Sequence, residues 1–252
     1  MRYYEAFVAS LRYIFTCGSE AVRVSSIPCL TVTSDDMCGR FFLDTNVKDI
    51  MEHYNEAPPD IFSARYNIAP TTPVMACTDK GLTFFRWGLI PSWAKDLTMG
   101  NRMFNARAET VAEKPSFRHA YRRRRCLVPA SGYYEWRLEN GRKQPYCCHI
   151  DHQLFSMAGI WEHWQDADGN EIQSCAIITT EAQNAVAEIH HRMPVHISRQ
   201  DYSRWLNHST ENTSEADILM SSTSPRYQYY AVNTTVNNSR NEGKDLIRAL
   251  EP

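Results

Sequence analysis

Residues 125–150 read RCLVPASGYYEWRLENGRKQPYCCHI, and this stretch decides the fold. Within it, residues 126–129, 133–138 and 145–150 are rich in aromatic and aliphatic side chains, which is typical of strands. Asn140 and Gly141 separate the last two segments, and both tolerate the positive φ angles that a two-residue hairpin turn requires. The stretch therefore predicts consecutive antiparallel strands with a tight turn between the second and the third.

The same pattern continues on both sides of this stretch. Further strands are expected at residues 39–43, 74–77, 82–87, 155–162, 173–180, 195–197 and 227–232. Helical spacing of apolar residues predicts helices from Val47 to Tyr54, after Ser198, and at residues 107–113, 115–121, 181–189 and 214–220. The sequence therefore predicts a single α+β domain in which antiparallel sheet dominates.

The composition narrows the classes of protein to which the chain can belong. Its 252 residues are 43% hydrophobic, and its net charge of −2 excludes a globally basic nucleic-acid coat but not a local basic groove. The chain has no run of 18 apolar residues, so we expect no transmembrane helix. The eight cysteines show neither CxxC pairs nor zinc spacing, which favours free thiols in a reducing, cytoplasmic compartment and no metal site.

The stretch Met37, Cys38, Gly39, Arg40 contains a cysteine with an unusual possible reactivity. If translation starts at Met37 and the methionine is removed, Cys38 carries a free α-amine next to its thiol, and such a 1,2-aminothiol condenses with an aldehyde to a thiazolidine ring. An internal cysteine cannot do this, because its nitrogen is an amide. Residues 1–36 fit neither a signal peptide nor a transit peptide well. We expect them to be a mis-assigned start or a leader that is disordered or removed, and residues 37–252 to form the domain.

Each of three polar side chains can be interpreted either as a site residue or as an ordinary structural residue. Glu135, between Tyr134 and Trp136, is a surface glutamate or a desolvated proton shuttle whose pKa is raised. His190 either interacts with a helix C-terminus or titrates in a site. Asn105 either caps a helix or orients a reacting group.

Several cations and one tryptophan are candidates for contacts with nucleic acid. Arg40, Arg107 and Arg192 each lie inside a motif, and arginine matches phosphate geometry bidentately. The cluster of Arg118 and residues 122–125 is a solvated face or a phosphate-binding surface. Trp87 is expected in the core, whereas Trp93 follows a proline in a loop and could stack on a base.

The motifs occur in a specific order along the chain. After Met37 they are RYNIAP (65–70), WGLIPSW (87–93), NARAET (105–110), RCLVPASGYYEW (125–136), IHHRMP (189–194) and VNTTVNNSRNEG (232–243). In this order the chain resembles the SRAP family, named for SOS-response-associated peptidases, over residues 37–252. The resemblance implies a single domain with a mainly antiparallel, barrel-like sheet and short flanking helices.

The resemblance also implies roles for individual residues. Cys38 matches the N-terminal nucleophile, and Asn105, Glu135 and His190 match its active-site partners. Arg40, Arg107 and Arg192 match DNA-contacting positions, and Trp93 matches an aromatic residue near the bound strand. His191 and Ser131 depart from the pattern, since many members have Asp there. No cofactor and no metal are implied.

The function implied is that of an abasic-site sensor in the DNA damage (SOS) response. A monomer in the cytoplasm, associated with the nucleoid when bound, would cross-link itself to abasic sites in single-stranded DNA through Cys38 and shield the lesion from cleavage. Two other functions stay open: a cysteine-type autopeptidase that removes residues ahead of Cys38, and a non-catalytic DNA-binding module. The second leaves Glu135 and His190 without a role.

Overall fold

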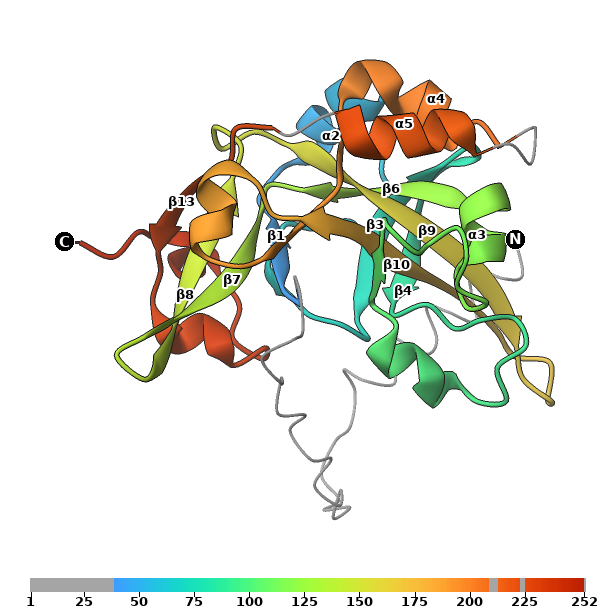
Figure 1. Cartoon of the computed structure of the whole chain (residues 1–252), viewed down its shortest axis with the longest axis horizontal. Helices are drawn as coiled ribbons and strands as arrows, with labels where there is room; N and C mark the ends of the chain where they lie inside the picture. The colour runs from blue at the N-terminus through green and yellow to red at the C-terminus, as the bar shows by residue number, and fades with distance from the viewer. Residues whose placement is uncertain (1–38, 209–212, 223–224, 252) are drawn as a thin grey trace, which may run out of the picture. The chain divides into compact units, whose positions relative to one another are not determined.

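The computed structural model describes residues 39–208, 213–222 and 225–251 of the chain (Figure 1). Met37, Cys38 and the expected leader at residues 1–36 lie outside the described residues, so the predicted domain boundary stays a prediction. The described residues belong to one compact unit.

Five strands close into a barrel. Their pairing runs β10–β4–β3–β6–β9 and returns from β9 to β10. The strands are β3 (Pro73–Thr78), β4 (Gly81–Trp87), β6 (Arg125–Ala130), β9 (Phe155–Gln165) and β10 (Glu171–Glu181). Three short strands extend this sheet: β5 (Asn105–Arg107) and β11 (Arg192–Pro194) pair with β10, and β12 (His196–Ile197) pairs with β9. Pairing is antiparallel except where β10 meets β4 and β5.

A second sheet of five antiparallel strands lies beside the barrel. Its order is β13 (Gln228–Ala231), β8 (Arg142–His149), β7 (Gly132–Glu139), β1 (Phe41–Leu43) and β2 (Arg65–Ile68). The turn between β7 and β8 is Asn140 and Gly141, with φ angles of 49° and 76°, which confirms the predicted two-residue hairpin. In Figure 1 this hairpin and β13 extend to one side of the barrel.

The two sheets share one continuous segment. Only Ser131 separates β6 of the barrel from β7 of the second sheet. Its N–H donates to the carbonyl of Phe42 at 2.9 Å, and its hydroxyl contacts the backbone N–H and carbonyl of Asp44 at 3.0 and 3.2 Å. These bonds fix β1 against the junction between the sheets, and they give a role to a residue that departs from the family pattern.

Short helices cover the barrel. They are α2 (Val47–Tyr54), α3 (Arg118–Arg123), α4 (Tyr202–Leu206) and α5 (Ser214–Ser222), with 3₁₀ helices η1 (Leu97–Arg102), η2 (Asn184–Glu188), η3 (Arg199–Asp201), η4 (Thr234–Asn237) and η5 (Lys244–Ile247). The Asn46 side chain caps α2 by accepting from the Asp49 N–H. Figure 1 shows α2, α4 and α5 together, and the bonds His53–Tyr202 and Arg204–Glu215 join them.

The α+β class and the mainly antiparallel, barrel-like sheet are confirmed. Two predicted helices, at residues 107–113 and 181–189, are wrong. Residues 105–107 form β5 because β10 offers them a strand edge, and turns follow up to residue 117. The segment 181–189 shortens to η2, because β10 extends to Glu181 and pairs there with Arg192. Tertiary pairing outweighs local periodicity in both places.

Burial of individual side chains tests several expectations from the sequence. Trp87 is fully buried in the core, as predicted. Cys77, Cys126, Cys147, Cys148 and Cys175 are buried free thiols. Arg125 of the basic cluster is also buried, where it donates to the carbonyls of Trp205 and Tyr121. In the described part of the chain, no helix has the length and apolar character needed to cross a membrane.

The tight packing at the sheet junction can be tested with Gly132→Ala. A Cβ atom there would lie 2.5 Å from the Phe42 ring and 2.7 Å from the Cys148 carbonyl oxygen, so we expect a loss of about 1–3 kcal/mol in the free energy of unfolding. Denaturant titration measures this loss. Adding Phe42→Leu should restore part of it, and unchanged stability of the single variant would contradict the packing described.

Candidate active site

The entry into β1 lies beside two of the predicted site residues. Phe41 pairs with Tyr133, and the Tyr134 N–H donates to the Arg40 carbonyl at 2.9 Å, so the same register places Gly39 opposite Glu135. A Cβ atom on Gly39 would lie 3.9 Å from the ring of Phe104, the residue before Asn105. Gly39 directly follows Cys38 in the sequence, so the first described residue already lies next to the Phe104 ring and, in the register of β1 and β7, opposite Glu135.

Glu135 is a buried acid. Only 2% of its surface is exposed, so the interpretation as a surface glutamate is wrong. It faces Tyr146 across the β7–β8 pair, and its charge adds to burial in raising the pKa of the Cys148 thiol. Alternation along β7 places it on one face with Tyr133 and Arg137. A carboxyl group is therefore held inside the protein next to the entry of β1.

Asn105 opens β5 and lies opposite Ile177 of β10 in a parallel pair. Because it begins a strand, the interpretation as a helix cap is wrong. Its side chain is half-buried. The strand pairing fixes its backbone, so the amide is carried on a rigid element and not on a free loop.

His190 follows η2 and is also half-buried. Its Nδ1 lies 3.2 Å from the Arg192 N–H nitrogen and 3.4 Å from the Arg192 carbonyl oxygen, so the backbone holds Nδ1 in either neutral tautomer and leaves Nε2 for a substrate. Burial lowers the pKa of His190, and the charges of His191, Arg192 and Lys143 lower it further. The imidazole is therefore mainly neutral at pH 7 and can accept a proton.

The three motif arginines differ in their surroundings. Arg40 donates from Nη1 to Asn67 Oδ1 at 2.7 Å and to the Val236 carbonyl at 2.8 Å, and burial lowers its pKa. Arg192 is 8% exposed and forms a bidentate ion pair with Glu109, at 2.7 and 2.9 Å. Arg107 at the end of β5 is exposed. The DNA contacts expected of all three stay predictions, and Arg107 is the one that faces solvent.

Trp93 lies in the turn after β4 and is 56% exposed, as the loop position predicted. The Trp164 indole donates to the carbonyl of the neighbouring Ala94 at 2.8 Å and ties this turn to β9. An exposed ring on an anchored turn is available for stacking.

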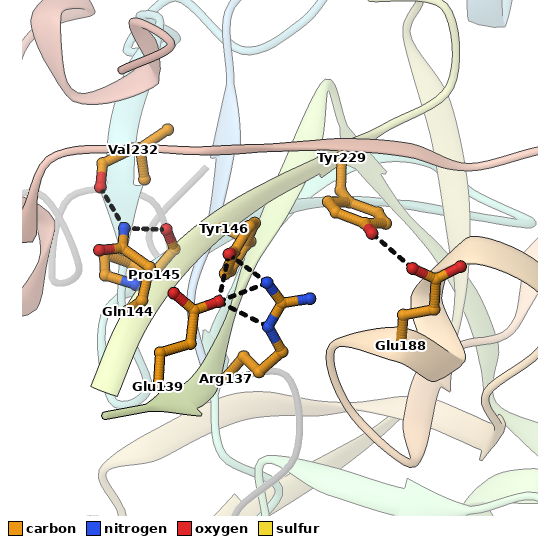
Figure 2. A network of polar contacts seen from close by, with 8 residues as sticks. All are labelled: Arg137, Glu139, Gln144, Pro145, Tyr146, Glu188, Tyr229 and Val232. Carbon is orange, nitrogen blue, oxygen red and sulfur yellow. Dashed lines mark hydrogen bonds and ion pairs between the residues drawn. The ribbon is translucent and has the colours of Figure 1, made fainter. Parts of the chain in front are cut away.

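A polar network beside Glu135 lies outside the motifs found in the sequence (Figure 2). Arg137 donates to Glu139 Oε1 at 2.6 Å and to the Tyr146 hydroxyl at 2.6 Å, and that hydroxyl donates to Glu139 at 2.5 Å. The Tyr229 hydroxyl donates to Glu188 Oε2 at 2.7 Å. Alternation in residues 133–139 could have placed Arg137 and Glu139 on the face of Glu135, but the partners from β8, β13 and η2 required the fold.

The described residues contain no group of three or more His, Cys, Asp or Glu side chains placed to hold a metal ion. The expectation that the chemistry uses no metal stays a prediction. The register of β1 and β7 brings Glu135 next to Gly39. The predicted site residues offer a buried carboxyl group at Glu135, a half-buried neutral imidazole at His190 and an amide at Asn105 on a paired strand. Such a set can move protons during attack of an amine or a thiol on a carbonyl carbon.

The chain is similar to proteins named as abasic site processing proteins and to a solved structure. The abasic site processing protein YoqW of Bacillus subtilis is 38% identical over 226 residues, covering 84% of this chain and all of YoqW. The abasic site processing protein HMCES of Pongo abelii is 29% identical over 238 residues, covering 77% of this chain and 67% of HMCES. A crystal structure of a protein from Bacteroides thetaiotaomicron superposes with a TM-score of 0.75 at 29% identity, covering 84% of this chain and all of that one.

The family model described as SOS response associated peptidase (SRAP) matches residues 37–239, which include every motif from MCGR to IHHRMP and the first eight residues of VNTTVNNSRNEG. The match begins at Met37, the residue that precedes Cys38. This chain belongs to the SRAP family.

Proposed function

We propose that this protein captures abasic sites in single-stranded DNA by forming a thiazolidine between Cys38 and the deoxyribose. The observation that carries the proposal is the position of Gly39, the residue after Cys38, opposite the buried Glu135 in the register of β1 and β7 and beside the Phe104 ring. The names of the relatives, which are abasic site processing proteins, agree with it.

The chemistry starts at the α-amine of Cys38 once Met37 is removed. In the open form of the abasic sugar, C1′ is an aldehyde carbon, and the neutral amine attacks it to give a carbinolamine. The carbinolamine loses water and becomes a Schiff base. The Cys38 sulfur then adds to the same carbon while the nitrogen takes up a proton, which closes the five-membered ring. Both nucleophiles belong to one residue, so the second addition is intramolecular and gains from proximity.

Three side chains have roles in these steps. Glu135 moves protons during carbinolamine formation and loss of water, because it is buried and lies opposite Gly39 in the register of β1 and β7. His190 assists opening of the sugar through Nε2, since Nδ1 is held by Arg192. Asn105 holds the head group of Cys38 by its amide. The usual pKa of an α-amine is about 7.7–8.0, so burial and a nearby cation increase the neutral, reactive fraction.

Ring closure explains why the product would protect DNA. A Schiff base withdraws electrons and promotes β-elimination of the 3′ phosphate, which breaks the strand. A thiazolidine carbon is saturated and lacks this electron sink. A protein that closes the ring faster than elimination proceeds therefore keeps the strand intact at the lesion.

The DNA is expected to be single-stranded at the lesion, because a stacked sugar in duplex DNA is hard to reach. Exposed Arg107 is suited to a phosphate contact, and exposed Trp93 to stacking. For Arg40 and Arg192 we propose phosphate contacts that add to, or replace, their bonds to Asn67 and Glu109. These contacts carry no base code, so little sequence preference follows. We propose that one chain suffices for capture.

Cross-linking to DNA tests the proposal directly. Protein expressed from Met37 and incubated with single-stranded DNA that contains one abasic site should form a conjugate that survives heat and denaturant. Cys38→Ser should lose this stable product, since an oxygen closes a less stable ring, and Cys38→Ala should lose it completely. The control is protein that retains Met37, which keeps the thiol but blocks the amine. Undiminished conjugate with Cys38→Ala or with retained Met37 would contradict the proposal.

The full-length chain tests the competing function of an autopeptidase. If the protein cleaves itself, chain expressed from Met1 should yield a new N-terminus at Cys38, and the Cys38→Ala variant should not. Intact mass measurement distinguishes the two. Turnover of unrelated peptides without DNA would favour the peptidase over the proposed capture reaction.

The pH dependence of capture tests the environment assigned to His190. The Lys143 charge lowers the pKa of this imidazole, so Lys143→Gln should raise that pKa. A step that needs the neutral ring fails below the pKa, so the acidic limb of the cross-linking rate should move to higher pH. NMR titration of His190 measures the same shift. Lys80→Gln, at the exposed β3–β4 turn, is the control; an unmoved limb in Lys143→Gln contradicts the assignment.

A further inference from the structure

The two proposed proton-transfer groups belong to different sheets. Glu135 lies on β7 of the five-stranded sheet, whereas His190 follows η2, which connects β10 and β11 of the barrel. Contacts between η2 and the second sheet therefore contribute to their relative position. Among the described residues, a side-chain bond joins these parts directly: the Tyr229 hydroxyl donates to Glu188 Oε2 at 2.7 Å.

We propose that Glu188 and Tyr229 are positioning residues whose contact holds His190 in place relative to Glu135. This inference rests on the proposed function, because it assigns the two residues to the same reaction. Neither residue lies in a motif that the sequence analysis identified, and neither is expected to touch the sugar.

Strand pairing places Tyr229 on the same face of the sheet as Glu135. Tyr146 lies opposite Glu135 on one side and opposite Ala231 on the other. Residues paired across antiparallel strands share a face, and so do alternate residues of one strand, so Tyr229 shares that face with Ala231. Figure 2 shows the Tyr229 hydroxyl pointing from β13 toward Glu188.

The sheet end of this contact is rigid. The rings of Tyr146 and Tyr229 meet edge to face, with centroids 5.5 Å apart and planes at 82°. Tyr146 is itself fixed by Arg137, whose guanidinium carbon lies 4.7 Å from the ring centroid, and by Glu139. These contacts limit the positions that the Tyr229 ring, and with it the hydroxyl, can adopt next to η2.

The η2 end is rigid as well. Glu188 ends η2, two residues before His190, and the His190 N–H donates to the Val186 carbonyl at 3.0 Å. The Arg192 N–H holds the imidazole from the other side. A displacement of Glu188 would therefore move the imidazole with it. The bond to Glu188 also raises the pKa of Tyr229, so the hydroxyl stays a donor at neutral pH.

Substitutions can break the bond without breaking the fold, because the contact is exposed to solvent. Tyr229→Phe keeps the ring against Tyr146 and removes only the hydroxyl. The matched control is Tyr230→Phe, the adjacent residue on β13, whose hydroxyl donates to the Ile247 carbonyl at 2.8 Å on the opposite face. Glu188→Ala removes the acceptor, whereas Glu188→Gln removes the charge and keeps an acceptor oxygen.

Single-turnover cross-linking to abasic single-stranded DNA is the main readout. We expect Tyr229→Phe and Glu188→Ala to slow it by about 10-fold each, and the double variant to be no slower than either, because both remove one contact. Glu188→Gln should recover most of the rate and Tyr230→Phe should keep it. Affinity for DNA with a tetrahydrofuran site, which has no aldehyde, should stay unchanged in all of them.

A wild-type rate in Tyr229→Phe, or an equal loss in Tyr230→Phe, would overturn this inference and leave the proposed function standing. Additive losses in the double variant would also overturn it, since they imply separate roles. NMR of the His190 imidazole without DNA should show a changed signal in Tyr229→Phe and not in Tyr230→Phe. A wild-type protein that forms no conjugate overturns the proposed function, and this inference with it.

Discussion

The structure depends on one segment that serves two sheets. Strands β6 and β7 follow each other with only Ser131 between them, so the barrel and the second sheet are joined by continuous backbone. Gly132 allows the Phe42 ring to pack directly against this junction, and the Ser131 hydroxyl bonds to the backbone of Asp44 at the far end of β1. These contacts fix β1 against the junction. Gly39, which precedes β1, therefore lies opposite Glu135 in the register of β1 and β7.

The candidate site is therefore assembled by strand register more than by loops. Glu135, Asn105 and Gly39 are placed by the pairing of β7, β5 and β1, and Arg192 is held by Glu109 and the Thr179 carbonyl. His190 is the exception, because it follows a short 3₁₀ helix and is held by bonds to the backbone of Val186 and Arg192. The proposed contact between Glu188 and Tyr229 adds the link from this helix to the second sheet.

Much of the fold could be predicted from the sequence, and the reasons for the failures are physical. The strands within residues 125–150 and their Asn-Gly turn follow from local propensity, and so does the cap at Asn46. Strands β2 and β5 were missed because they are short and gain their stability from neighbours far away in the sequence. Position alone favoured a solvated Glu135, since alternation does not reveal which face of a strand is covered. The Tyr229–Glu188 bond joins segments with no sequence signal in common.

The central claim is that a single residue supplies both the nitrogen and the sulfur that bind the sugar. NMR of the conjugate formed with DNA carrying ¹³C at C1′ of the abasic site tests it most directly. The account predicts a saturated carbon coupled to the ¹⁵N-labelled α-nitrogen of Cys38 and bonded to its sulfur. An imine carbon, or a carbon without coupling to that nitrogen, would contradict it.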